Sequence, residues 1–277
     1  MSRADQRTAD AFAESWNHLP RGSVYTEAQV EDWFSPLVPA DLRGKRVLEM
    51  GCGNASLMAH VLRWGPAQLD GIDLGDAVDS ARRNLAASGC SNWSVRRADL
   101  ESFASAGYDV VYSIGVLHHL AAPRRGLEAV LRNTRPGGRF HCWVYAREGN
   151  GVVRWMVDPL RRVASRLPWW FTKYGLAAPL VVPYYLYAKA IASMRRSEWM
   201  RAMPLYEYSL WIARREFAFF RHVAFDQLVA PRTAYLDRAT IESWLADDPS
   251  IAPGSTYLIM RNGNSWKFGG RRRDGAP

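Results

Sequence analysis

The sequence lacks closely spaced cysteines. Its 277 residues include three, Cys52, Cys90 and Cys142, and no two of them form a Cys-x-x-Cys pair. A zinc ribbon is built from such pairs, and a small disulfide-stabilised domain needs a denser set of cysteines. The sequence therefore predicts no metal site and no disulfide framework, and it favours a reducing, cytoplasmic compartment.

A long apolar run is also missing. The first sixteen residues are polar and contain no apolar core of the kind found in signal peptides. Residues 176–188 are uncharged, but they are interrupted by Pro179 and Pro183 and fall short of the ~20 residues that cross a bilayer. We therefore expect no spanning helix. An apolar lid over an acceptor site is expected here, and an interfacial helix with peripheral membrane contact is the alternative.

Negative charge is scarce in one region only. The net charge is +9, of which residues 146–201 carry +7 and residues 271–274 carry +2, so the remainder is neutral. A nucleic-acid footprint usually extends over the face of a whole domain. We therefore expect a small-molecule partner and no nucleic acid, and the oligomeric state does not follow from the sequence.

Short β-rich runs alternate with helical stretches from residue 45 to residue 146. Strands are expected at 46–50, 68–73, 92–97, 108–114 and 139–145, with helices at 55–64, 77–87 and 124–134. A helix at 240–246 and two strands at 255–261 and 265–269, joined by a tight Asn262-Gly263 turn, complete the pattern. The prediction is an α/β fold with a doubly wound, mostly parallel, seven-stranded Rossmann-like sheet.

The alternation stops in a Trp- and Pro-rich stretch, which we interpret as an inserted helical cap. Upstream of the sheet, Thr26 is expected to cap a helix that runs to Trp33, with Gln29 closing a capping box. The expected organisation is 1–44 as an N-terminal helical lid segment, 45–147 as the core, 148–224 as the cap insertion, 225–270 as the completion of the sheet, and 271–277 as a disordered tail.

The strongest motif follows the first expected strand. Glu49 ends that strand, and Gly51 and Gly53 let the backbone turn sharply beside a ligand at the start of the next helix. Asp73 ends the second strand, 20 residues after Gly53, where an acid can accept both hydroxyls of a ribose. This combination predicts an adenosine-binding site.

These residues resemble the class I S-adenosylmethionine-dependent methyltransferases of the small-molecule type. The first motif is present except that Ala55 replaces its third glycine, which we expect to affect only the closeness of helix packing. Asp99, the strand and loop at 108–120, and the Pro136-Gly137-Gly138 turn match further motifs in order. The resemblance implies S-adenosylmethionine as cofactor, S-adenosylhomocysteine as product, and these donor-binding residues: Glu49, Gly51, Cys52, Gly53, Asn54, Asp73, Leu74, Asp99, Leu100 and Ser113, with Tyr25 and Trp16 folding over the donor.

Methyl transfer asks little of side chains beyond alignment and exclusion of water, but a hydroxyl or amine acceptor can need a base. His118 and His119 are the candidates, and the resemblance favours His119. Packing or capping is the alternative role for each. The acceptor is expected to be a largely apolar or anionic metabolite, with Arg154, Arg161, Arg162 and Arg166 offering a basic helix face to its charge. The expected acceptor-binding residues are Tyr145, Trp169, Tyr184, His222, Asp226, Arg232 and Tyr235.

Three other functions compete with this interpretation. A nicotinamide-dependent oxidoreductase usually has a third glycine where Ser56 stands and does not need Glu49. Base-amino methyltransferases carry Asn/Asp-Pro-Pro-aromatic where this chain has Ser113-Ile-Gly-Val, and cytosine-C5 enzymes need a Pro-Cys pair that is absent. A donor-binding protein without turnover stays open, because an intact donor site does not reveal catalysis.

Overall fold

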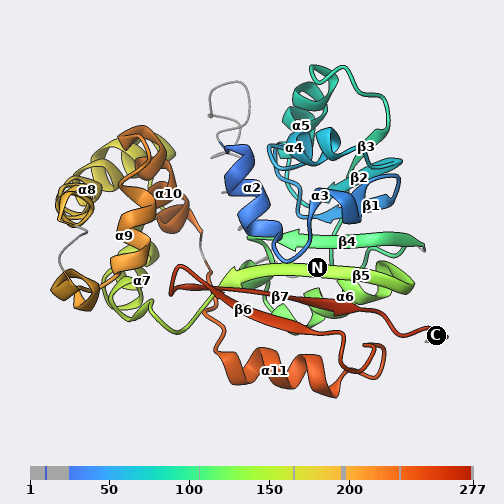
Figure 1. Ribbon diagram of the computed structural model, residues 1–277. Helices are drawn as coiled ribbons and strands as arrows, with labels where there is room; N and C mark the ends of the chain where they lie inside the picture. Colours follow the sequence, from blue (N-terminus) through green and yellow to red (C-terminus); the bar gives the residue numbers. More distant parts are fainter. Residues whose placement is uncertain are drawn as a thin grey trace. The chain divides into compact units, whose positions relative to one another are not determined.

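The computed structural model describes residues 10, 25–105, 107–164, 166–194, 198–230 and 232–275. A seven-stranded sheet organises the first of two compact units, with the strand order β3-β2-β1-β4-β5-β7-β6 (Figure 1). The strands are β1 (Arg46–Met50), β2 (Gln68–Asp73), β3 (Trp93–Arg97), β4 (Tyr108–Ile114), β5 (Thr134–Tyr145), β6 (Tyr257–Arg261) and β7 (Ser265–Arg271). The predicted fold class is confirmed.

The first five strands are parallel, and β7 is not. β1 pairs with β2 and β4, β2 with β3, and β4 with β5, all in parallel register. β7 runs antiparallel to β5, since Gly138 accepts a hydrogen bond from Arg272 at one end and Ala146 donates to Asn264 at the other. The β6–β7 turn has positive φ at Asn262 (51°) and Gly263 (65°), which confirms the tight turn.

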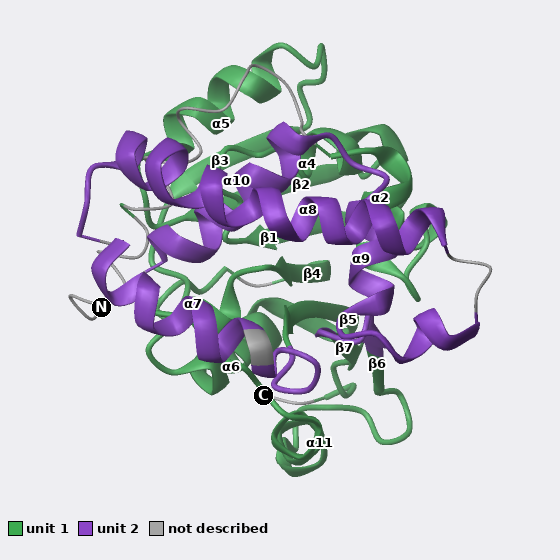
Figure 2. Cartoon of the chain, turned by 90° about the vertical axis from the view of Figure 1, so that its left-hand side faces the viewer, with its two compact units in different colours: residues 1–145, 232–259, 266–277 green, residues 146–231, 260–265 purple. Residues whose placement is uncertain are grey.

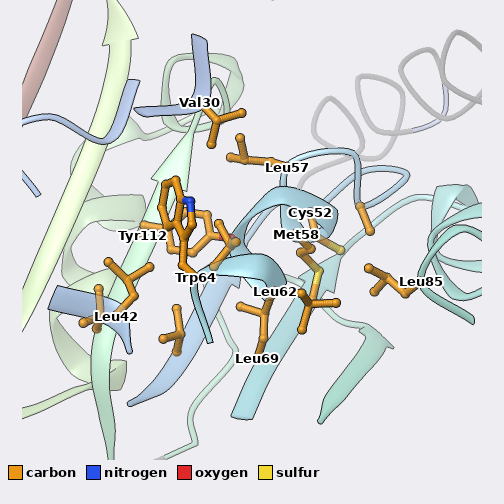
Figure 3. Packing of buried hydrophobic residues seen from close by; sticks show 14 of the residues in the cluster. Val30, Leu42, Cys52, Leu57, Met58, Leu62, Trp64, Leu69, Leu85 and Tyr112 are labelled. Atoms are coloured by element: carbon orange, nitrogen blue, oxygen red, sulfur yellow. The ribbon is translucent and has the colours of Figure 1, made fainter. Parts of the chain in front are cut away.

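Helices pack on the sheet through an apolar core shown in Figure 3. α2 (Glu27–Phe34), α3 (Pro39–Leu42), α4 (Met58–Val61) and α5 (Ala77–Ala86) supply side chains to it together with β1, β2 and β4. α6 (Pro123–Asn133) packs on β4 and β5, and α11 (Arg238–Asp247) precedes β6. Short 3₁₀ turns follow α4 at Leu62–Trp64 and follow β4 at Leu117–His119.

Two boundaries differ by three or more residues from the sequence expectation. α4 begins at Met58 and not at 55, because Ala55 has φ +62° and cannot be the first residue of a right-handed helix. That left-handed backbone, more than helix packing, is what a glycine at this position would relieve. β5 begins at Thr134 and not at 139, because the amide of Gly137 and the carbonyl of Gly138 both pair with Arg272.

At the start of α2 the predicted helix cap is present, but the predicted capping box is not. The Thr26 hydroxyl accepts a hydrogen bond from the Gln29 amide, which confirms the helix cap. The Gln29 side chain does not close a capping box: it is buried, and its amide group has no hydrogen-bond partner among the described residues.

The C-terminal residues are ordered further than expected. Arg271 is the last residue of β7, and Arg272 forms a bridge with Ile251. The Arg272 guanidinium also donates to the Thr134 carbonyl at 2.7 Å. These contacts hold the segment against the sheet, so the prediction of a disordered tail from 271 is wrong for residues 271–272.

The second unit comprises residues 146–231 and 260–265 (Figure 2). Its helices are α7 (Gly151–Ala164), a π-helical segment Phe171–Ala177 that continues into α8 (Ala178–Ser193), a 3₁₀ turn at Glu198–Ala202, α9 (Tyr206–Ile212) and α10 (Phe217–Val229). The unit extends to residue 231, past the expected cap boundary at 224, because α10 continues to Val229. Phe171–Ser193 together form one helix whose length and composition would suffice to cross a membrane, with 22% of its most apolar window buried.

Candidate active site

The turn after β1 brings two loops into contact. The amides of Gly51 and Cys52 donate to the Ile72 carbonyl at 2.8 and 2.9 Å, which holds the turn against the end of β2. Gly51 has φ +89°, and a Cβ on it would lie 2.3 Å from the Val116 side chain. Glycine is therefore required at position 51, because the loop after β4 lies directly against its backbone.

Asp73 is fixed by two backbone amides. Its Oδ2 accepts from Gly53 at 2.8 Å, and its Oδ1 accepts from Gly75 at 2.9 Å. Burial raises the pKa of Asp73, and these N–H donors act against that rise. Each carboxylate oxygen keeps a second lone pair for a ligand, so the side chain can accept two hydroxyl groups in a fixed orientation.

Glu49 lies behind the same turn and is almost fully buried. The Tyr112 hydroxyl donates to its Oε2 at 2.8 Å. Burial raises the pKa of Glu49 to about 8; the Tyr112 hydrogen bond opposes this rise and the charge of Asp73 adds to it. A carboxylate at Asp73 favours a positively charged ligand group, whereas Glu49, whose pKa is about 8, is mostly protonated at neutral pH.

Two of the expected donor-binding side chains have structural contacts of their own, and a third is kept neutral by burial. Asn54 Oδ1 accepts from the amide of Ser56 at 3.1 Å and from its hydroxyl at 2.7 Å, which closes the turn internally. The Ser113 hydroxyl donates to the Met50 carbonyl at 2.8 Å and links β4 to β1. Burial raises the pKa of the Cys52 thiol well above its usual range, so that side chain stays neutral.

The remaining expected donor contacts lie at the ends of β2 and β3 and before α2. Asp99 is half-buried and accepts from the Glu101 amide at 3.1 Å, while Leu100 is buried and Leu74 half-buried. Tyr25 packs edge-on against Trp33 with the ring centroids 4.8 Å apart. Trp16 lies outside the described residues.

The histidine pair forms the 3₁₀ turn after β4. His118 is buried, with its ring centroid 4.3 Å from that of Tyr145 and 4.2 Å from that of His119. His119 is half-buried, and its Nδ1 lies 2.9 Å from the Arg232 carbonyl and 3.3 Å from the Thr233 hydroxyl. A carbonyl only accepts hydrogen bonds, so Nδ1 carries a proton, and in a neutral ring Nε2 is then the unprotonated nitrogen.

A row of aromatic rings continues from the histidines along the same sheet edge. Tyr145 stacks on Tyr235 at 6.1 Å and meets Trp143 edge-on at 5.2 Å. Trp143 in turn lies 6.3 Å from Trp33 of α2. The expected residues Tyr145, Arg232 and Tyr235 are therefore brought together with His119 in the first unit.

Sequence reasoning missed Trp33, Trp143 and Thr233 as members of this site. Trp143 could have been found, because it stands two residues before Tyr145 on the same face of a strand. Thr233 gives no such signal. Its place beside His119 depends on the Ala234 amide, which donates to the His118 carbonyl at 2.7 Å and anchors the returning segment.

The other expected acceptor residues lie in the second unit. His222 Nε2 is 3.2 Å from Asp226 Oδ2, and the Tyr184 hydroxyl bonds to that of Ser209 at 2.9 Å. Burial raises the pKa of Tyr184 to about 12. The half-buried Trp169 ring lies 5.9 Å from the Lys173 ammonium.

The expected basic face of α7 is wrong in one member. Arg161 is buried, and its guanidinium donates to Asp158 at 2.8 Å and to the Gln227 carbonyl at 2.7 Å. Arg162 and Arg166 are exposed. Arg161 therefore points into the helical unit and away from the exposed arginines, because residues one position apart on a helix face different directions.

Comparison with known proteins gives the context of this site. Residues 47–138 match the family model described as a methyltransferase domain. A tRNA U34 carboxymethyltransferase of Idiomarina loihiensis is 28% identical over 187 residues, which cover 61% of this chain and 56% of that protein. A phthiotriol/phenolphthiotriol dimycocerosates methyltransferase of Mycobacterium tuberculosis is 32% identical over 147 residues, covering 50% of this chain and 53% of that protein.

Some solved structures are similar along almost the whole chain, and one of them illustrates the match. Magnesium protoporphyrin IX methyltransferase from Synechocystis PCC 6803, with bound S-adenosylhomocysteine, aligns with a TM-score of 0.55 and 14% identity, covering 94% of this chain and 93% of that chain. At this identity the likeness concerns the fold. The chain spans just over half the length of the two curated relatives described here. The expectation of no nucleic-acid partner is not confirmed, because one relative is named for tRNA.

Proposed function

Because residues 47–138 form a class I, S-adenosylmethionine-dependent methyltransferase domain, we propose that the chain methylates a hydroxyl group on a small, largely apolar acceptor. The observation that carries this proposal is the position of His119. The Arg232 carbonyl orients its ring. His119 lies on the loop after β4, and this loop packs against the donor turn at Gly51. The loop thereby presents a base beside the donor site.

The residues of the donor turn fit S-adenosylmethionine. Asp73 offers two fixed oxygens to the ribose hydroxyls, and the bare backbone at Gly53 allows close approach of the amino-acid part. The Asp73 carboxylate at this turn favours a cationic ligand over a neutral one. When bound, S-adenosylmethionine supplies an electrophilic methyl group on a positively charged sulfur.

His119 acts as the general base in this proposal. With Nδ1–H directed at the Arg232 carbonyl, Nε2 accepts the hydroxyl proton of the acceptor as its oxygen attacks the methyl group. The Thr233 hydroxyl, 3.3 Å from Nδ1, helps to hold the ring in this orientation. His118 is buried between His119 and Tyr145 and supports the turn by packing.

The aromatic row supports an apolar acceptor of small size. Tyr145, Tyr235 and Trp143 present ring faces and edges, which enclose a ring system or an alkyl chain and exclude water from the reacting atoms. The lipid methyltransferase of Mycobacterium tuberculosis offers a related substrate class, whereas the tRNA-modifying relative offers a polyanionic one. The row of uncharged rings favours the former.

The test is formation of S-adenosylhomocysteine with a panel of acceptors. Purified full-length chain is incubated with S-adenosylmethionine and with apolar phenols, long-chain alcohols, apolar amines or unmodified tRNA. Turnover with a phenol or alcohol, and loss of that turnover in His119→Asn, is the expected result. Turnover restricted to tRNA would overturn the acceptor class, and retention of NAD in place of S-adenosylhomocysteine would overturn the donor.

A further inference from the structure

Exposed apolar side chains gather in one stretch of the second unit. Among the described residues, twelve large hydrophobic side chains are exposed, and ten of these lie between Gly151 and Met194. Soluble monomers seldom concentrate exposed apolar groups in this way, and such patches mark interaction surfaces. The stretch covers α7, the π-helical segment and α8 (Figure 2).

α7 carries its exposed apolar groups on one side. Trp155 has 79% of its surface exposed, and Val163 follows Met156 by seven residues and Trp155 by eight. At about 100° per residue, the three exposed side chains therefore lie within about 100° of one another around the helix. Arg162, near the C-terminal end of α7, and Arg166, two residues after that helix, are also exposed. The opposite side of α7 packs on α10.

α8 also exposes apolar side chains, with Lys189 as the single charged residue on its exposed side. Leu180, Val182 and Leu186 are exposed, and Leu186 has 64% of its surface exposed. The other face is buried inside the unit at Val181, Ala188 and Ile191. A helix with one packed apolar face and one exposed apolar face has a further surface to cover.

Hydrogen bonds tie α8 to its own unit. The hydroxyls of Tyr184 and Tyr185 bond to Ser209 and to the Arg215 carbonyl at 2.9 Å, and the Lys189 ammonium donates to the Ala213 carbonyl at 2.6 Å. A helix that crossed a bilayer at this point would lose these partners. The contacts therefore favour a helix that lies parallel to a surface, with its exposed face against that surface.

The charge of the unit indicates what that surface is. The sequence of residues 146–231 and 260–265 holds 14 arginines and lysines against 6 aspartates and glutamates, a balance of +8 in a chain of +9. From Gly151 to Met194 the only acidic residue in the sequence is Asp158, which is paired with Arg161. Exposed tryptophans among cations match the boundary between lipid headgroups and acyl chains.

We infer that the outer faces of α7 and α8 dock the protein on a bilayer with anionic headgroups. The apolar side chains enter the acyl boundary, and Arg162, Arg166 and the other basic residues meet the headgroup phosphates. An RNA partner would use the positive charge and the aromatic rings but has no complement for Leu180, Val182 and Leu186. This inference does not depend on catalytic turnover, so the two can fail separately.

The test is flotation of the full-length chain with vesicles of phosphatidylcholine, with and without phosphatidylglycerol. We expect binding to the anionic vesicles and much weaker binding to the neutral ones. Val182→Asp with Leu186→Asp should lower the bound fraction at least about tenfold, since two carboxylates would enter the acyl boundary. Ala239→Asp with Ala246→Asp adds the same charge at exposed positions of α11 and should bind like the parent chain.

Several outcomes would overturn the inference. One is absence of binding to anionic vesicles, and another is an equal loss of binding in both double variants. A third is that the chain binds labelled tRNA but does not bind vesicles.

If a second copy of the chain covers this surface instead, size-exclusion chromatography would show a dimer that dissociates only in the α8 double variant. Arg162→Gln with Arg166→Gln should weaken binding to anionic vesicles alone; equal binding would remove the headgroup contact. Unchanged circular dichroism shows that each variant is folded, and extraction of the bound chain by alkaline carbonate distinguishes lying on the bilayer from crossing it.

Discussion

The Nδ1 atom of His119 lies 2.9 Å from the carbonyl oxygen of Arg232, a residue 113 positions later in the chain. This contact joins the loop after β4 to the segment that returns from the helical unit to the sheet. The Ala234 amide strengthens the same junction by donating to the His118 carbonyl at 2.7 Å. The tautomer of the neutral imidazole therefore depends on backbone that the local motif does not contain.

Substitution of His119 should separate its two roles. In His119→Asn the shorter amide can still donate toward the Arg232 carbonyl, but no lone pair replaces Nε2. We expect turnover to fall by about 10²–10⁴-fold with donor affinity nearly unchanged. The check is steady-state kinetics beside calorimetric titration with S-adenosylhomocysteine. A loss of less than about threefold would leave His119 a positioning residue.

Asp73→Asn should weaken donor binding. The amide group cannot accept hydrogen bonds at both of its ends, so either Gly53, Gly75 or a ribose hydroxyl loses its acceptor. We expect the affinity for S-adenosylhomocysteine to fall by about 1–3 kcal/mol in calorimetry. Asp79→Asn, at an exposed position of α5, is the matched control. Equal affinity in both variants would remove Asp73 from the donor site.

Most of the sheet and the donor turn could be predicted, because both depend on local patterns. The strand over 108–114 was expected at the bounds that the structure gives, since a buried strand is a continuous apolar run. Asp73 was found for a similar reason: it is the last residue of a strand and stands at a fixed distance from Gly53. Ser113 and Asn54 were placed by resemblance alone, and the sequence did not indicate their own hydrogen bonds within the fold.

The acceptor side could not be predicted to the same depth. Thr233 and Arg232 reach His119 only through pairing of distant segments, which no periodicity reveals. Arg161 illustrates the reverse error. Helical spacing grouped it with exposed arginines, but a one-residue step on a helix turns the side chain by about 100° and carries it into the unit.

The contrast between Arg161 and Arg162 yields a stability prediction. Arg161→Ala should lower the free energy of unfolding of the helical unit by about 2–3 kcal/mol, because Asp158 and Gln227 lose a buried charged partner. Arg162→Ala, at an exposed position next to it, should change it by less than about 0.5 kcal/mol. Thermal unfolding of the two variants measures the difference, and similar midpoints would contradict the buried position of Arg161.

Glu49 should make the stability of the first unit depend on pH. The pKa of its carboxyl group is about 8 in the folded chain, raised from an ordinary value of 4.5 chiefly by burial. Between these values the folded chain holds a proton that the unfolded chain has released. The stabilisation from this group is therefore complete below about pH 4.5 and is lost as the pH rises toward 8.

Glu49→Gln isolates this effect. Glutamine keeps an oxygen that accepts from the Tyr112 hydroxyl but has no proton to lose. The free energy of unfolding of the parent chain, measured by urea titration, should fall relative to the variant by up to about 1.4 kcal/mol per pH unit across this window. Asp73 titrates in both proteins, so the difference between the two curves belongs to Glu49. Parallel curves from pH 5 to pH 9 would show that Glu49 ionises normally, and the turn would then carry a full second negative charge beside Asp73.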